Sequence, residues 1–232
     1  MTYSPCIKEG ILLVDKECGK TSFQLVSLLR KKSGIRKIGH AGILDPFASG
    51  VMILLIGRPF TRQAETLINQ DKEYLATVKL GETTDTFDCD GNITATNDTI
   101  VPSEPTIADV VGQFQGKTTQ IPPMFSAKKV GGQKLYHLAR KGIEVERKPI
   151  EIKLITTILN YDYPYLKLKI ACSKGTYIRT LAHDIGNALG TGAHLTALRR
   201  TRCGAFTLKD CIDSKSLAAP SCSYTDHLRR AL

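Results

Sequence analysis

The sequence predicts an α+β protein built around a mixed β-sheet. Apolar and alternating stretches typical of strands recur along the 232 residues, and helical patterns lie between them without the regular alternation of β-α-β units. A hydrophobic fraction of 42% is enough for one large domain or two small ones. The longest apolar run, residues 51–57, is far shorter than the roughly 20 residues that a membrane helix needs. We therefore expect no membrane association.

The chain begins with a strand and a capped helix. Residues 10–14 are apolar and predict the strand. Thr21 and Gln24 form a capping box in front of one apolar helical face, and Gly34 is a typical helix-ending residue. The run at 51–57 has no polar residue to face solvent, so it predicts a strand buried on both faces.

The middle of the chain contains shorter elements. The proline near the start of 59–69 suits the first turn of a helix over that range. Residues 74–80 alternate between two faces and predict a strand, whereas the acidic stretch 84–91 predicts a loop. We expect Thr106 to cap a helix that runs to about Phe114.

The C-terminal part of the chain predicts three strands and one helix. The first two strands lie near 150–159 and 165–172, and a tight turn follows them. Thr176 is a suitable N-cap for a helix over 177–189, and the last strand is expected near 194–202.

One carboxylate stands out in residues 39–50, where glycines and a proline bend the chain around Asp45. The buried strand that follows would hold this loop in place. No second carboxylate or histidine cluster lies near it in the sequence, so a nucleophile fits better than a metal ligand. An Asp in front of a proline is more often an ordinary turn residue. The residues by themselves leave both roles open.

The charge of the chain is distributed unevenly. Residues 1–120 carry a net charge of −1 and residues 121–232 carry +11. Such asymmetry favours a surface that meets a polyanion, most plausibly nucleic acid, although a merely soluble basic protein is the alternative. Trp is absent, so any stacking on bases must use Tyr, Phe or His.

The seven cysteines form no CxxC pair and no regular spacing, which favours reduced thiols over a disulfide framework or a zinc site. Residues 1–9 lack the basic start and apolar core of a secretory signal. Both observations predict a cytoplasmic protein.

Residues 120–149, the basic insertion, are rich in cations and glycines and contain one short helical stretch over 135–140 that ends at Gly142. We expect a mobile flap that orders on a nucleic-acid backbone, while a solvated excursion without a role is the alternative. The cations expected to contact RNA are Lys128, Lys129, Lys134 and Arg140.

Four blocks of sequence occur in order over about 190 residues. They are residues 14–22, 39–50, 72–91 and 172–200. Together they resemble the TruB family, the bacterial tRNA pseudouridine-55 synthases. Two positions depart from the family pattern, because Glu17 stands where Pro is usual and Ala41 where Thr is usual.

The resemblance implies the pseudouridine synthase fold: a mostly antiparallel mixed sheet with flanking helices and a central catalytic cleft. It implies an isomerase, an intramolecular transferase, that flips uridine 55 out of the T loop of tRNA and converts it to pseudouridine. No cofactor and no metal is implied, because the reaction is neither a redox step nor a hydrolysis.

The resemblance also assigns catalytic roles. Asp45 matches the nucleophile, and Arg179 matches an active-site arginine that we expect to pair with Asp45 and hold it ionised. Tyr74 matches the tyrosine that stacks on the flipped uracil and could assist removal of the C5 proton.

Five further residues match substrate-binding positions of the family. His40 would fill the gap that the flipped base leaves, and Lys16 would contact phosphate or support the fold. Asp88 would supply a supporting hydrogen bond, whereas Tyr177 and Leu198 match pocket positions and could equally be ordinary packing.

We expect a catalytic domain over 1–212 that includes the basic insertion, and a short tail over 213–232. The tail is too small for the C-terminal RNA-binding module that many family members carry, so RNA binding would rest on the catalytic domain. The expected partner is the T arm of tRNA, bound by a monomer without an obligate protein partner. Two alternatives remain: an RNA-binding or tRNA-folding module with little catalysis, and a synthase that acts on ribosomal RNA.

Overall fold

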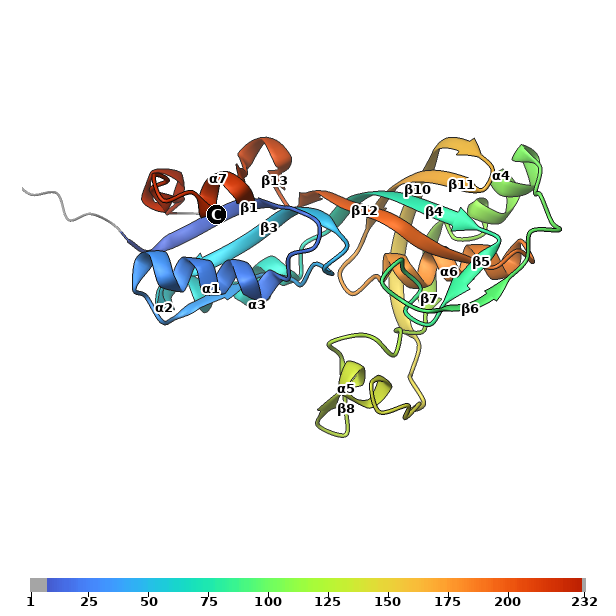
Figure 1. Cartoon of the computed structure of the whole chain (residues 1–232), viewed down its shortest axis with the longest axis horizontal. Coiled ribbons are helices and arrows are strands. Elements are labelled where there is room, and N and C mark those ends of the chain that lie inside the picture. Colours follow the sequence, from blue (N-terminus) through green and yellow to red (C-terminus); the bar gives the residue numbers. More distant parts are fainter. Residues whose placement is uncertain (1–7, 231–232) are drawn as a thin grey trace, which may run out of the picture. The chain divides into compact units, whose positions relative to one another are not determined.

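The computed structural model describes residues 8–230, which form two compact units (Figure 1). The first unit contains residues 8–73 and 199–230, and the second contains 74–198. The chain passes between the units inside two long strands, β4 (Lys72–Leu80) and β12 (Ala193–Cys203). Both strands therefore contribute residues to both units.

The first unit is a mixed sheet with short helices. Its other strands are β1 (Gly10–Lys16), β2 (Ile38–His40), β3 (Ser49–Ile56), β13 (Phe206–Thr207) and β14 (Ile212–Asp213). Its helices are α1 (Ser22–Ser33), α2 (Arg58–Thr61), α3 (Ala64–Ile68), α7 (Ser214–Ala218) and the 3-10 turns η1 (Leu208–Asp210) and η2 (Tyr224–His227). The strand order is β14–β1–β3–β12. β1 and β3 are antiparallel, whereas β14 is parallel to β1 and β12 is parallel to β3.

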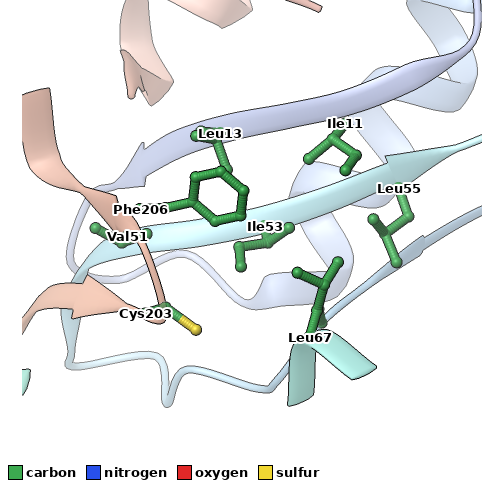
Figure 2. Packing of buried hydrophobic residues seen from close by; sticks show 9 residues of the cluster. Ile11, Leu13, Val51, Ile53, Leu55, Leu67, Cys203 and Phe206 are labelled. Carbon is green, nitrogen blue, oxygen red and sulfur yellow. The ribbon is translucent and has the colours of Figure 1, made fainter. Parts of the chain in front are cut away.

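The core of the first unit lies on the two central strands, β1 and β3, as Figure 2 shows. β3 is buried along nearly its whole length, because β1, β2 and β12 pair with it and side chains cover both faces. This is the environment that a continuous apolar run predicts. The buried cluster consists of Ile11, Leu13, Ala41, Val51, Ile53, Leu55, Leu67, Cys203 and Phe206.

The predicted ends of α1 are confirmed. The Thr21 side chain accepts a hydrogen bond from the backbone N–H of Gln24, and the Gln24 side chain accepts one from the backbone N–H of Thr21. Gly34 ends the helix at φ +72°, a left-handed conformation that glycine adopts without steric cost.

The single helix predicted over 59–69 is wrong, because α2 and α3 are two short helices. The backbone N–H of Gln63 donates to Phe60 O, three residues back, rather than to Pro59 O. The side-chain amide of Gln63 lies 3.5 Å from Pro59 O instead. This local competition for a helical acceptor interrupts the pattern between the two helices.

The second unit contains a sheet in which β10 pairs antiparallel with β7 and β11, together with two main helices. Its other strands are β5 (Glu82–Thr84), β6 (Ile93–Thr96), β7 (Gly116–Gln120), β8 (Lys129–Val130), β9 (Gln133–Lys134), β10 (Ile150–Asp162) and β11 (Tyr165–Cys172). Its helices are α4 (Glu104–Gly112), α5 (Leu135–Ala139) and α6 (Ile178–Ala188). The strand order is β12–β4–β11–β10–β7, and β5–β6 and β8–β9 form separate hairpins. The predicted α+β class with a mixed, mostly antiparallel sheet is confirmed; the central catalytic cleft stays a prediction.

Two predicted helix caps are wrong. Ser103, not Thr106, caps α4, and its side chain accepts the N–H of Thr106. Thr176 does not cap α6, because its hydroxyl donates to Ser173 O at 2.9 Å and Tyr177 is the N-cap. In both cases a local side-chain bond to a nearby backbone group decides where the helix begins.

The sequence analysis did not predict several short strands. β6 is exposed at every residue, and β8 and β9 have two residues each. Strands of this length and exposure carry no periodic hydrophobic signal. They form because hairpin partners pair with them, which is information that a local pattern does not contain.

Residues 213–230 are part of the first unit. Leu217 of α7 and Tyr224 of η2 are buried, and Arg229 forms a β-bridge with Ile11 of β1. The boundary predicted after residue 212 therefore coincides with no edge of either unit, and the division into a catalytic domain and a tail stays a prediction. No helix within residues 8–230 is long and apolar enough to cross a membrane.

Candidate active site

Asp45 lies in the loop between β2 and β3 of the first unit, and its side chain is partly open to solvent. The two residues before it and the proline after it are all held by hydrogen bonds to their backbone. The Ser22 hydroxyl donates to Leu44 O and accepts from Leu44 N–H, both at 3.1 Å. Gly19 N–H donates to Pro46 O at 2.8 Å. The carboxylate is therefore presented on a backbone that is fixed on both sides.

Arg200 of β12 is a second support of this loop. The side chain is only 1% exposed. Its Nε donates to Val51 O at 2.7 Å and its Nη1 to Ile43 O at 3.3 Å, so one guanidinium joins the loop to the strand that follows. Gly50 adopts φ +110°, and a side chain there would collide with the Arg200 backbone. Only glycine allows β3 and β12 to approach so closely.

Lys16 at the end of β1 is the third support, and it is fully buried. Its Nζ donates to Lys20 O at 2.6 Å, Glu17 O at 3.0 Å and Pro46 O at 3.2 Å. Burial lowers the pKa of Lys16 to about 8, while the charge of Asp45 acts in the opposite direction. Of the two roles expected for Lys16, these contacts fit support of the fold, because the three ammonium protons already have acceptors.

His40 lies at the end of β2, just before the loop of Asp45, and is half-buried. Its Nδ1 is buried without a hydrogen-bond partner among the described residues. Burial, and secondarily the positive charge of Arg200, lower the pKa of His40 from 6.5. The ring is therefore uncharged near neutral pH and stands where the chain enters the loop of Asp45.

The two departures from the family pattern have structural counterparts. The backbone N–H of Glu17, which a proline would lack, donates to the Ser214 hydroxyl of α7 at 3.1 Å. Ala41 is fully buried in the cluster on β1 and β3. Neither substitution falls on a residue that is assigned to catalysis.

Arg179 on the first turn of α6 contacts two other segments of the second unit. Its Nη1 donates to Thr86 O at 2.9 Å and its Nη2 to Phe125 O at 2.8 Å. Its Nε lies 3.5 Å from Asp88 Oδ2, and both side chains are 7% exposed. Asp88 Oδ1 also accepts from the Thr86 hydroxyl at 2.6 Å. These contacts fit the supporting hydrogen-bond role expected for Asp88.

Phe87 lies between Thr86 and Asp88, and the sequence analysis did not identify it as a site residue. It adopts φ +64°, an uncommon conformation for a side chain of this size. Its ring stacks on His183 of α6 with centroids 3.9 Å apart. His183 lies one helical turn after Arg179, so the helix contacts the loop at 84–91 twice. No local pattern signals this stack, because it depends on two segments distant in the sequence.

Tyr74 is a buried residue of β4. Leu198 near the middle of β12 is buried, and Tyr177 at the start of α6 is half-buried. The pairing predicted between Arg179 and Asp45 joins residues of different units and stays a prediction.

The basic insertion brings its predicted cations together in one small motif. Lys129 of β8 and Lys134 of β9 are directly opposite each other in the hairpin, an arrangement of like charges that is unfavourable without a counterion. Lys134 and Arg140 lie 5.5 and 5.7 Å from the ring centre of Tyr136. The backbone of Lys128 holds the motif together, because its carbonyl accepts the N–H of Leu135.

Comparison with known proteins places these features in a family. The family model of the TruB family pseudouridylate synthase N-terminal domain matches residues 30–178, and that of the tRNA pseudouridylate synthase B C-terminal domain matches 179–232. The chain is 53% identical over 92% of its length to tRNA pseudouridine synthase B of Protochlamydia amoebophila, covering 81% of that protein. It is 52% identical over 96% of its length to the protein of the same name from Chlamydia abortus, covering 94% of it.

Solved structures share the fold. The structure of a Cbf5-Nop10-Gar1 complex matches 90% of this chain with a TM-score of 0.70 and 31% identity. An H/ACA RNP bound to a substrate RNA matches 92% with a TM-score of 0.66 and 28% identity. In each case the chain spans 53% of the length of its counterpart. Fold and relatives together define a pseudouridine synthase, which is an isomerase. The chain belongs to the TruB family of pseudouridylate synthases.

The double hydrogen bond between Ser22 and Leu44 leads to a first prediction. Ser22→Ala leaves both backbone groups of Leu44 without this partner, and we expect unfolding free energy to fall by about 1–3 kcal/mol. The rate of pseudouridine formation in single-turnover assays should fall about tenfold, since the backbone beside Asp45 loses a support.

The control is Ser33→Ala at the other end of α1. The Ser33 hydroxyl also donates to one backbone group, Leu29 O, and accepts from another, Ile35 N–H. Its loss should lower stability while leaving the rate of the folded enzyme near that of the wild type. Equal rates for the two variants would contradict a positioning role for Ser22.

The environment of His40 leads to a second prediction. Because burial lowers its folded-state pKa below 6.5, the folded chain binds fewer protons than the unfolded chain just below that pH. The stability of the wild type should therefore decrease, relative to His40→Phe, as pH falls through 6.5. NMR titration of the assigned His40 ring together with denaturant unfolding checks this; a midpoint above 6.5 would contradict it.

Proposed function

We propose that this enzyme converts uridine 55 in the T loop of tRNA to pseudouridine, with Asp45 as the nucleophile. The observation that carries the proposal is the presentation of Asp45, which is partly exposed while its neighbours Ile43, Leu44 and Pro46 are held by buried groups. A nucleophile that is fixed before the substrate arrives loses little entropy in the reaction. The relatives named tRNA pseudouridine synthase B support tRNA as the substrate.

The reaction is an isomerisation. The N1–C1′ bond of the uridine breaks, the uracil turns over, and a C5–C1′ bond forms. The proton on C5 leaves and N1 gains one, so atoms and charge balance without an oxidant or water. Asp45 forms a transient covalent bond with the sugar or with the base, which divides one difficult step into two.

Tyr74 and Arg179 complete the proposed catalytic set. Tyr74 stacks on the flipped uracil, a contact worth about 1–3 kcal/mol per base, and assists removal of the C5 proton. Arg179 stabilises the carboxylate of Asp45, and its planar guanidinium is already oriented by Thr86 O and Phe125 O. His40, held uncharged, occupies the space that the flipped base leaves in the loop.

RNA binding rests on the second half of the chain, where the positive charge is concentrated. A phosphate group relieves the repulsion between the opposed lysines of the basic insertion. The ring of Tyr136, close to Lys134 and Arg140, offers a surface on which a base can stack. We also propose a cytoplasmic monomer. The scattered spacing of the seven cysteines, without a CxxC pair, supports this setting.

The third prediction concerns Asp45. Asp45→Asn should abolish tritium release from C5-labelled tRNA transcripts while tRNA binding is retained, because the amide keeps the shape of the side chain and lacks its nucleophilicity. Asp109→Asn, the same change on the exposed face of α4, should leave the rate unchanged. Turnover by Asp45→Asn would defeat the assignment of the nucleophile.

The same assay separates the alternative functions. Mapping the modified position distinguishes uridine 55 from other sites, and labelled ribosomal RNA fragments test that substrate. A tRNA-folding module with little catalysis would be favoured if Asp45→Asn restored a synthase-deficient strain as fully as the wild type did.

The fourth prediction concerns the basic insertion. Replacing Lys129 and Lys134 together by Gln should weaken tRNA binding and reduce the dependence of log Kd on log salt concentration by about 1–2, since each phosphate contact releases counterions. Replacing the exposed Lys31 and Lys209 by Gln removes the same charge elsewhere. If both double variants lose the same salt dependence, the effect is one of net charge, and the insertion has no special role.

A further inference from the structure

Gln120, the last residue of β7, is only 4% exposed. Both the nitrogen and the oxygen of its side-chain amide form hydrogen bonds. Its Nε2 donates to Tyr177 O at 3.0 Å, and its Oε1 accepts from Tyr177 N–H at 2.8 Å. Tyr177 is the N-cap of α6, and its own side chain makes no capping hydrogen bond. The amide of Gln120 therefore fixes the residue at which α6 begins.

Gln120 is also the first residue of the basic insertion. Its backbone pairs with Ile150, the first residue of β10, so the chain leaves and re-enters the sheet at one rung of the β7–β10 ladder. Figure 1 shows the insertion leaving the sheet near β7, with β8 and α5 at its far end. Arg147 Nη1 closes the stem a little further out by donating to Pro122 O at 3.3 Å.

Arg179 ties the same stem to α6 a second time. It follows Tyr177 by two residues, and its Nη2 donates to Phe125 O, five residues after Gln120. The segment 120–125 is thus fastened to the first turn of α6 at both of its ends. Both attachments therefore join the stem to the helical turn that carries Arg179.

We propose that Gln120 is a positioning residue: it holds the first turn of α6 so that Arg179 is aligned for catalysis, and it couples that alignment to the basic insertion. The proposal rests on the function proposed above for Arg179. An amide is the side chain for this position, because it offers a donor and an acceptor to one backbone residue at once.

The test uses Gln120→Glu, which keeps the size of the side chain and replaces the donor to Tyr177 O by an oxygen. Gln115 provides a control that is matched in hydrogen bonding, although it is exposed and Gln120 is buried; Gln120→Met controls for the buried charge. Its amide makes the same two-way bond with the backbone of Thr156 in β10, donating at 2.6 Å and accepting at 2.9 Å. Gln115→Glu therefore breaks the same chemistry in the same sheet away from α6.

In single-turnover assays at saturating enzyme, Gln120→Glu should lower the rate of pseudouridine formation about tenfold or more, with the tRNA Kd changed by less than about threefold. Gln115→Glu should keep both values near those of the wild type. Equal rates for the two variants, or a wild-type rate for Gln120→Glu, would overturn the proposal. Gln120→Met, which is uncharged and of similar length, serves if the glutamate variant fails to fold.

Hydrogen–deuterium exchange gives a readout that needs no activity. Peptides covering 177–182 should exchange faster in Gln120→Glu than in Gln115→Glu, because the Tyr177 carbonyl loses its donor and faces a carboxylate oxygen instead, which loosens the first turn of α6. Unchanged exchange there would refute the holding of α6. Failure of the proposed function would look different, since the wild-type enzyme itself would then form no pseudouridine in tRNA.

Discussion

The arrangement depends most on buried side chains that bond to the backbone of the Asp45 loop. Ser22, Lys16 and Arg200 come from three different elements, and each donates a hydrogen bond to a backbone carbonyl within residues 43–46. Hydrogen bonds to charged groups contribute about 1.5–3 kcal/mol each, and losing one leaves a buried carbonyl unpaired. The backbone on both sides of Asp45 is therefore held in place, while Asp45 itself is partly exposed.

In the second unit, hydrogen bonds between side chains and backbone also hold the surroundings of Arg179. Its guanidinium bonds to the carbonyls of Thr86 and Phe125 and lies against Asp88, while Gln120 fixes the start of the helix that carries it. Both candidate catalytic groups thus stand on backbone that is held by polar side chains, rather than on loops that must find their conformation with each substrate. Such preorganisation lowers the cost of reaching the reactive geometry.

Local chemistry made much of the fold predictable. The capping box at Thr21 and the glycine at Gly34 delimit α1, and the apolar run of β3 identifies a strand buried on both faces. The prediction failed where nearby side chains compete for the same backbone groups, as at Gln63 and Thr176. It also failed for the short exposed hairpins, which a hydrophobic pattern does not mark.

By itself, the sequence determined the α+β class, the charge asymmetry and the four blocks that mark the family, because spacing, composition and motif order are local properties of the chain. Only the tertiary structure decided that Lys16 supports a loop, that Phe87 stacks on His183 and that Gln120 binds the start of α6. These contacts join residues up to 96 positions apart. Which distant polar groups meet depends on how the strands pair, and no local pattern encodes that choice.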